Sequence, residues 1–99
     1  SPGQASYAAS KGGILALVST LAVEVGRHGV RVNALAPGLI DAGMVKATPA
    51  DRLRGAREQI PLGRLGDARE VARAAVFLLS DDASYVNGHT LVVDGGLSA

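Results

Sequence analysis

The sequence predicts an α/β fold in which helices pack on a parallel sheet. Two short apolar segments, 30–36 and 90–93, have the length of strands and end at glycine-containing turns. Both segments are mostly apolar, which is typical of strands covered on two faces. Helix signals surround them, so the expected order is helix, strand, helix, helix, strand.

The first helix is expected over residues 4–25. Gly29, just beyond it, is expected to cap its end in the left-handed conformation. Gly12 and Gly13 inside the segment each disfavour the helix by about 1 kcal/mol, and close packing of another backbone would explain them. The apolar positions with helical spacing are Ala8, Leu15, Val18, Leu21 and Val25.

Two further helices have recognisable starts. Thr48 is the expected cap of a short polar helix, with Pro49 at its first position and its end near Gln59. Asp67 and Glu70 form the pattern of a capping box for the next helix. The buried stripe expected on that helix is Val71, Ala74, Ala75, Leu78 and Leu79.

Composition excludes several classes of function. The 99 residues are 47% hydrophobic with net charge +1, which predicts a single globular unit, 1–99, and no nucleic-acid partner. There is no cysteine, and the two histidines are far apart in sequence, so no metal site is expected. No apolar run approaches the roughly 18 residues that span a bilayer, so no membrane partner is expected. The lack of cysteine fits a cytoplasmic protein.

Two strands are too few to cover two apolar helices, so the sequence requires more sheet than it contains. The chain begins Ser1-Pro2-Gly3, as if it were cut within a loop. We therefore expect a single partial domain whose N-terminal half is absent.

Tyr7 and Lys11 are the candidate catalytic pair. They are four residues apart near the start of the first helix, so their side chains share one face. Tyrosine ordinarily has a pKa of about 10, but a nearby ammonium and a helix N-terminus both stabilise a phenolate. Such a pair can exchange a proton with a carbonyl or alcohol oxygen. Taken alone, the same spacing also fits an ordinary exposed pair.

Four motifs give this pair a context. They are Tyr7-Ala8-Ala9-Ser10-Lys11, the run 31–38 (RVNALAPG), the run 61–66 (PLGRLG) and Val93-Asp94-Gly95-Gly96. Together they resemble the C-terminal part of the short-chain dehydrogenases/reductases, most closely the 3-oxoacyl-acyl-carrier-protein reductase type. The resemblance covers essentially the whole chain. It implies the C-terminal portion of a Rossmann-like doubly wound parallel sheet, with two strands and about three helices.

The resemblance also implies roles for individual residues. Tyr7 matches the catalytic acid/base, and Lys11 matches the lysine that supports it and binds the nicotinamide ribose. Pro37 and Gly38 match the turn beside the nicotinamide, and Ile40 matches a position whose backbone contacts the carboxamide. The implied cofactor is NAD or NADP. The implied substrate is a ketone, a secondary alcohol or an acyl carrier, and the implied assembly is a homo-oligomer.

Several family features have no counterpart in this sequence. The substrate-binding serine that precedes the tyrosine by about a dozen residues is absent, as are the glycine-rich pyrophosphate turn and a helix asparagine. Ala42 stands where the family usually has a threonine that touches the cofactor. We therefore expect the isolated chain to be inactive. The sequence selects neither the substrate nor between NAD and NADP.

Alternatives remain at the level of residues and of function. Ser10 either touches the substrate pocket or packs, whereas Asn33 and Asp94 favour structural hydrogen bonds. His28 and His89 are expected at the surface. The arginines of the polar helix form a solvated face or meet an acidic carrier or a phosphate; they are Arg52, Arg54 and Arg57. The alternative functions are a non-catalytic oligomerisation or binding module and a truncated remnant.

Overall fold

The computed structural model describes residues 4–41, 43 and 45–99. The three α-helices are α1 (Gln4–Gly26), α2 (Ala50–Gln59) and α3 (Ala68–Leu79). The strands are β1 (Ala34–Pro37), β2 (Ile40–Asp41), β3 (Gly66–Asp67) and β4 (Thr90–Val93). Two short 3-10 helices cover Val45–Ala47 and Asp81–Ala83. The predicted α/β class and the three helices are confirmed.

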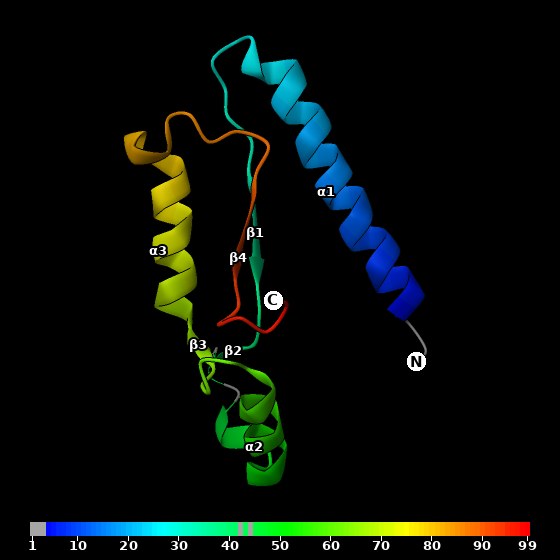
Figure 1. Cartoon of the computed structure of the whole chain (residues 1–99), viewed down its shortest axis with the longest axis vertical. Helices are drawn as coiled ribbons and strands as arrows, with labels where there is room; N and C mark the ends of the chain where they lie inside the picture. Colours follow the sequence, from blue (N-terminus) through cyan, green and yellow to red (C-terminus); the bar gives the residue numbers. More distant parts are fainter. Residues whose placement is uncertain (1–3, 42, 44) are drawn as a thin grey trace.

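The two longer strands form the centre of the molecule. β1 and β4 run parallel with Ala34 opposite Thr90 and Pro37 opposite Val93. In Figure 1 this pair lies between α1 on one side and α3 on the other, with α2 beyond the end of the strands. Both strands therefore end near α2, so the carboxyl ends of the sheet lie at that side of the molecule.

The first strand is shorter than the sequence predicts. It begins at Ala34 rather than Val30, because side chains and turns already bind the backbone before it. The Val32 amide donates to Asn87 Oδ1 (2.9 Å), and the Val32 carbonyl accepts from Gly88 N (2.8 Å).

A second parallel pair joins β2 to β3, with Ile40 opposite Gly66. Neither strand is among the two that the sequence predicts, so the predicted number of strands is wrong. Each strand has only two residues, which is too short for a periodic pattern to reveal.

The start of α3 is confirmed as predicted. The Asp67 side chain accepts from Arg69 N (2.8 Å), and the Glu70 side chain accepts from Asp67 N (2.9 Å), which completes the capping box. For α2 the prediction is wrong by one residue, because Pro49 occupies the cap position without a side-chain cap bond.

Arg31, which the sequence analysis assigned no role, binds the other end of α3. Its guanidinium donates to the carbonyls of Leu78 (2.7 Å), Ser80 (3.2 Å) and Val86 (3.3 Å). Carbonyls at a helix C-terminus lack partners within the helix, so a cation there is stabilising. Arg31 thus fastens the segment before β1 to α3.

The core is small. Among the described residues the buried apolar side chains are Ala22, Ile60, Leu78 and Ala83. The radius of gyration is 15.9 Å, whereas a compact chain of this length has about 13 Å. Leu79, predicted in the buried stripe of α3, is 84% exposed. The expected full burial of both strands is likewise wrong, because β1 and β4 are only partly covered.

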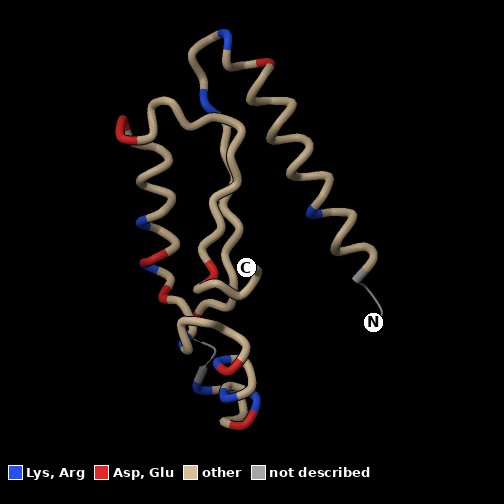
Figure 2. Tube along the Cα trace, in the orientation of Figure 1, with Lys and Arg blue, Asp and Glu red and all other residues tan. Residues whose placement is uncertain are grey.

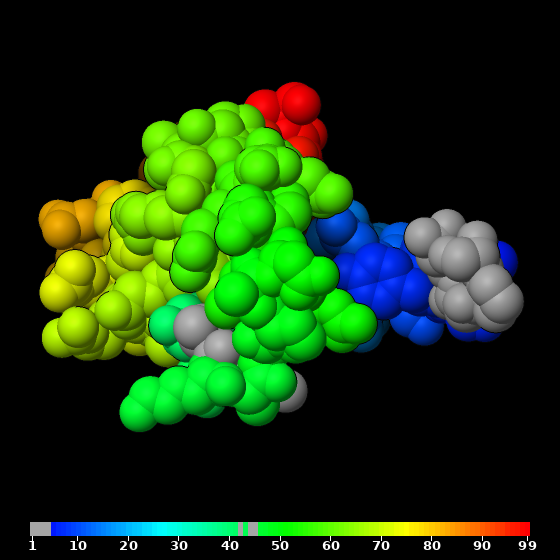
Figure 3. Space-filling view, turned by 90° about the horizontal axis from the view of Figure 1, so that it is seen from below, coloured from blue at the N-terminus to red at the C-terminus, as the bar shows by residue number. Residues whose placement is uncertain are grey.

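Helix α1 projects from the rest of the molecule, as Figure 3 shows from the side of α2. A Cβ built on Gly12 or Gly13 meets nothing within 4 Å, so the predicted close backbone packing at these glycines is wrong. Ile14 and Leu17 are both more than half exposed. The helix is apolar around its circumference, which is typical of a buried helix rather than a surface one.

The segment Ala5–Gly26 of α1 is long and apolar enough to cross a bilayer, with a mean hydropathy of 1.4. From the sequence we expect no apolar segment close to the length that spans a bilayer. That expectation is wrong, because this segment has both the length and the hydropathy. A helix covered by a sheet meets the same criteria, so they do not identify a membrane span on their own.

Candidate active site

A cleft of about 250 Å³ lies between the N-terminal half of α1 and β1. Tyr7 and Lys11 line one wall, and Pro37 lies at the carboxyl end of the strand that forms the other. Ser10 also lines the cleft, which favours the interpretation that it faces the pocket. The remaining lining residues are Ile14, Leu15, Ala34, Leu35 and Ala36. The cleft thus combines an apolar floor with three polar side chains.

Tyr7 and Lys11 stand one helical turn apart on α1, as the sequence predicts. The Tyr7 side chain is 70% exposed, and Lys11 is also exposed. Within residues 4–41, 43 and 45–99, neither the phenol nor the ammonium has a hydrogen-bonding partner. No described residue therefore occupies either group, and both line the cleft.

The turn after β1 is held tightly against the turn after β4. The Gly38 amide donates to the Val93 carbonyl (3.0 Å), which extends the ladder between the two strands. A Cβ on Gly38 would lie 2.5 Å from the Asp94 Cβ. Only glycine allows this approach, so Gly38 fixes the path of the chain away from Pro37.

Ile40 lies on a different cleft from Tyr7 and Lys11. This second cleft, of about 240 Å³, includes Ile40, Gly66, Glu70 and Asp94 in its lining. The structure therefore brings Tyr7, Lys11 and Pro37 together and leaves Ile40 on a separate surface. Ala42, which stands at the family's threonine position, lies outside the described residues.

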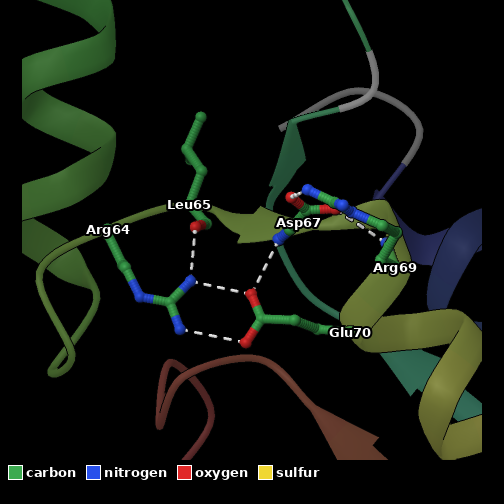
Figure 4. A network of polar contacts seen from close by, with 5 residues as sticks. All are labelled: Arg64, Leu65, Asp67, Arg69 and Glu70. Atoms are coloured by element: carbon green, nitrogen blue, oxygen red, sulfur yellow. Dashed lines mark hydrogen bonds and ion pairs between the residues drawn. The ribbon is translucent and has the colours of Figure 1, made fainter.

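A polar network supports the β2–β3 pair (Figure 4). Two nitrogens of the Arg64 guanidinium donate to the two carboxylate oxygens of Glu70, at 2.8 and 3.0 Å. The hydrogen bonds from Arg64, followed by the Asp67 amide, lower the pKa of Glu70 from 4.5 to about 2. Glu70 therefore fixes the loop 64–67, whose Gly66 amide in turn donates to the Leu39 carbonyl (3.0 Å).

The two expected structural hydrogen-bonding residues have that role. Asn33 donates to the Val86 carbonyl (3.0 Å) and accepts from His89 N (2.9 Å). Asp94 accepts from Gly96 N (2.9 Å) and from Ser98 Oγ (2.6 Å), and these bonds, chiefly that of Ser98, lower the pKa of Asp94. Sequence reasoning expected both roles.

The two terminal glycines of the fourth motif permit a close contact with the loop after α2. Gly95 has a φ of +65°, and a Cβ there would lie 2.8 Å from Ile60 Cγ2. Ile60 is one of the few buried side chains, so this contact belongs to the small core. The motif was recognised in the sequence, but its packing partner was not.

Charged side chains gather on α2, whereas α1 carries few (Figure 2). Arg52, Arg54 and Arg57 are exposed on this polar helix, which fits both a solvated face and contact with an acidic carrier or a phosphate. His28 and His89 are exposed, as expected. In the part of the chain that the structure describes, no group of three or more histidine or acidic side chains could hold a metal ion.

Comparison with known proteins defines the class. A family model described as Enoyl-(Acyl carrier protein) reductase matches residues 1–98. The chain belongs to this family, and it corresponds to the C-terminal part of a short-chain dehydrogenase/reductase.

Individual relatives are of the 3-oxoacyl reductase type. The chain is 48% identical over 95 residues to the 3-oxoacyl-[acyl-carrier-protein] reductase of Salmonella typhimurium, which covers 96% of this chain and 39% of the relative. The Thermotoga maritima reductase of the same name is 46% identical over 96 residues, with 97% and 39% covered. The chain therefore spans about two fifths of the length of these relatives.

Solved structures agree with the fold. The 3-oxoacyl-[acyl-carrier protein] reductase of Brucella melitensis has a TM-score of 0.88 at 40% identity, covering 94% of this chain and 35% of that one. A short chain dehydrogenase from Bacillus anthracis has a TM-score of 0.82 at 45% identity, covering 93% and 36%. The predicted fold, part of a Rossmann-like parallel sheet, is confirmed.

Proposed function

We propose that this chain supplies the proton-transfer and nicotinamide-facing part of an NAD(P)-dependent oxidoreductase that interconverts a ketone and a secondary alcohol. The names of the relatives point to a 3-oxoacyl group on an acyl carrier as the substrate class. The proposal also includes a cytoplasmic location. The observation that carries it is the cleft in which Tyr7 and Lys11, both free of protein partners among the described residues, face the carboxyl end of β1.

The position of this cleft fits a ligand site. In α/β sheets, ligands bind outside the carboxyl ends of parallel strands, where loops leave backbone groups available. The turn at Pro37 and Gly38 lies at such an end. The close contact of Gly38 with Asp94 keeps the turns after β1 and β4 next to each other. A flat nicotinamide ring can therefore approach β1 without meeting a side chain at Gly38.

The residues of the cleft suit proton transfer to a substrate oxygen. The cofactor, when bound, supplies or accepts the hydride. Tyr7 donates its phenolic proton to the carbonyl oxygen as the alcohol forms, and accepts a proton in the reverse direction. Lys11, one turn away, stabilises the charge that develops on the Tyr7 oxygen and is available to bind ribose hydroxyls.

The described residues lack the usual arrangement for binding the pyrophosphate of such a cofactor. In 4–41, 43 and 45–99 there is no strand that leads through a glycine-rich turn into a helix, the arrangement that binds a pyrophosphate. Residues for the pyrophosphate and adenosine would therefore come from elsewhere, and we propose that the isolated chain is inactive.

A second function is favoured by the apolar surface of α1. Ile14 and Val23 are 58% and 73% exposed, which fits a helix that is covered by another chain. A non-catalytic assembly module would use this surface, and it would need neither Tyr7 nor Lys11.

A fusion protein separates the two functions. In it, the part of the Salmonella typhimurium reductase that precedes the matched region is joined to residue 1 of this chain. The proposal predicts NAD(P)H-dependent reduction of a β-ketoester or a 3-oxoacyl thioester, measured by loss of absorbance of the reduced cofactor. A fusion protein that folds and binds cofactor but has no turnover would contradict the enzymatic function and favour the module.

A further inference from the structure

Helix α1 is joined to the strands at its carboxyl-terminal end. Figure 1 shows that this end lies near the loops before β1 and β4, and that α1 diverges from the strands toward its N-terminus. Asn87 lies at the junction. Its Nδ2 donates to the Ala22 carbonyl (3.0 Å), and its Oδ1 accepts from Val32 N (2.9 Å). One amide group therefore links α1 to the segment that leads into β1.

Small residues let the helix approach this amide closely. A Cβ on Gly26 would lie 3.2 Å from Asn87 Nδ2, and one on Gly88 would lie 3.3 Å from the Ala22 Cβ. Ala22 itself is only 3% exposed, in contrast to most of α1. The last turn of the helix is thus packed on Asn87 and Gly88, while the turns before it are largely uncovered.

Because α1 is packed mainly at its last turn, a small change of its angle there displaces its N-terminal residues by a large distance. Tyr7 lies fifteen residues before Ala22, which corresponds to about 22 Å along the helix axis. A rotation of about 10° at the junction would therefore move Tyr7 by about 4 Å. A misplacement of 1 Å can already cost about 100-fold in rate. The angle at the junction consequently decides whether Tyr7 and Lys11 face the end of β1.

We propose that Asn87 is a positioning residue that sets the angle between α1 and the strands, and so sets where Tyr7 and Lys11 lie relative to the carboxyl end of β1. It acts through the helix and touches neither substrate nor cofactor. The effect of Asn87 on catalysis rests on the proposed function of Tyr7. The effect of Asn87 on the angle of α1 does not depend on that function.

The chain contains a matched control for this role. Asn33 also joins two backbone groups, since it donates to the Val86 carbonyl and accepts from His89 N. Both of its partners belong to the segment before β4 and neither belongs to α1, so its substitution removes two bonds of the same kind without removing the bond to α1 itself. Within Asn87, the substitution Asn87→Asp keeps an acceptor for Val32 N but removes the donor to the Ala22 carbonyl.

The experiment measures the angle on the whole 99-residue chain. Because the chain has no cysteine, spin labels can be attached at an introduced pair. Ser6→Cys with Ala72→Cys reports the far end of α1 relative to α3, and Glu24→Cys with Ala72→Cys reports the near end. All three positions are exposed. Pulsed electron paramagnetic resonance, on labelled chain diluted into an excess of unlabelled chain so that only distances within one molecule count, then gives the distribution of each distance.

We expect a narrow distribution for both pairs in the unsubstituted chain. Asn87→Asp and Asn87→Ala should at least double the width for the 6–72 pair while leaving the 24–72 pair nearly unchanged, because the displacement grows with distance from the junction. Asn33→Ala should leave both widths unchanged. A broad 6–72 distribution in the unsubstituted chain, equal broadening of both pairs, or equal effects of Asn33→Ala and Asn87→Asp would overturn the proposal.

Turnover of the fusion protein separates this inference from the proposed function. There we expect Asn87→Asp to lower kcat at least tenfold and Asn33→Ala to retain it. If Tyr7 proves dispensable while the distances respond as expected, the proposed function fails and the role of Asn87 in setting the angle of α1 stands. If kcat responds but the distances do not, the positioning role is wrong.

Discussion

Gly38 and Asp94 touch where the turns after β1 and β4 meet. A Cβ on Gly38 would lie 2.5 Å from the Asp94 Cβ and 2.9 Å from its Cα. The obstacle includes backbone, so a side-chain rotation cannot relieve it. Asp94 is in turn held by bonds from Gly96 and Ser98. The contact therefore sets the spacing of the two strand ends beside the candidate site.

Gly38→Ala should lower the free energy of unfolding by about 1–3 kcal/mol, because the added methyl group forces the two turns apart. Denaturant titration followed by circular dichroism measures this change. Gly12→Ala is the matched control. Nothing lies within 4 Å of a Cβ at Gly12, so alanine there should stabilise α1 by about 0.5–1 kcal/mol. Equal effects of the two substitutions would show that the contact at Gly38 is not tight.

Glu70→Gln should reduce the loss of folding stability that occurs as the pH is lowered. The bonds from Arg64 and the Asp67 amide hold the pKa of Glu70 at about 2 in the folded chain, below its ordinary value of 4.5. A carboxylate with a lowered pKa stabilises the fold above its unfolded pKa, and this contribution is lost as the pH falls from about 4.5 toward 2. Thermal melts between pH 7 and pH 2 measure it.

Glu58→Gln serves as the control, because Glu58 is an exposed carboxylate on α2 outside this network. The Arg64 and Glu70 side chains are 56% and 37% exposed. Salt at about 1 M should therefore reduce the difference in stability between the unsubstituted chain and the Glu70→Gln variant at neutral pH. Identical acid profiles for Glu70→Gln and Glu58→Gln would disprove the role of the network.

The chain by itself should bind NAD(P)H weakly, with a dissociation constant well above the low micromolar range. The physical reason is that, among the described residues, no strand leads through a glycine-rich turn into a helix, the arrangement that binds a pyrophosphate. Fluorescence of the reduced cofactor or calorimetry measures the affinity. Binding in the low micromolar range would mean that another part of this chain binds the phosphates.

The chain should also self-associate at micromolar concentrations. α1 exposes Ile14 and Leu17, and in the described sheet β1 pairs only with β4, which leaves its other edge open. Light scattering after size exclusion measures the mass, and Leu17→Lys should shift it toward the monomer. A single 10.0 kDa species at all concentrations would disprove this expectation.

The sequence predicted those parts of the fold that depend on local signals. The capping box of Asp67 and Glu70 and the left-handed Gly29 involve neighbours in sequence, and both are confirmed. The β2–β3 pair escaped prediction because Ile40 and Gly66 are distant in sequence and each strand has only two residues. The exposure of Leu79 also escaped, because periodicity shows which face is apolar but not whether anything covers it.

In the candidate site, too, the sequence predicted the local feature and missed the one that depends on distant residues. The spacing of Tyr7 and Lys11 follows from one helix, so the sequence alone predicts their shared face. Their position opposite Pro37 depends on the angle of α1, which is set by contacts of Ala22 and Asn87 across 65 residues. No local pattern contains that information, and sequence reasoning accordingly assigned Asn87 no role.

The proposed proton transfer between Tyr7 and the substrate oxygen is tested by kcat of the fusion protein that carries Tyr7→Phe. Phenylalanine keeps the ring in the cleft and removes only the hydroxyl, so cofactor affinity should remain while kcat falls by about 10²–10⁴-fold. Lys11→Ala should lower kcat and also weaken cofactor binding. A Tyr7→Phe fusion protein that folds, binds cofactor and retains the unsubstituted kcat would show that Tyr7 does not transfer the proton.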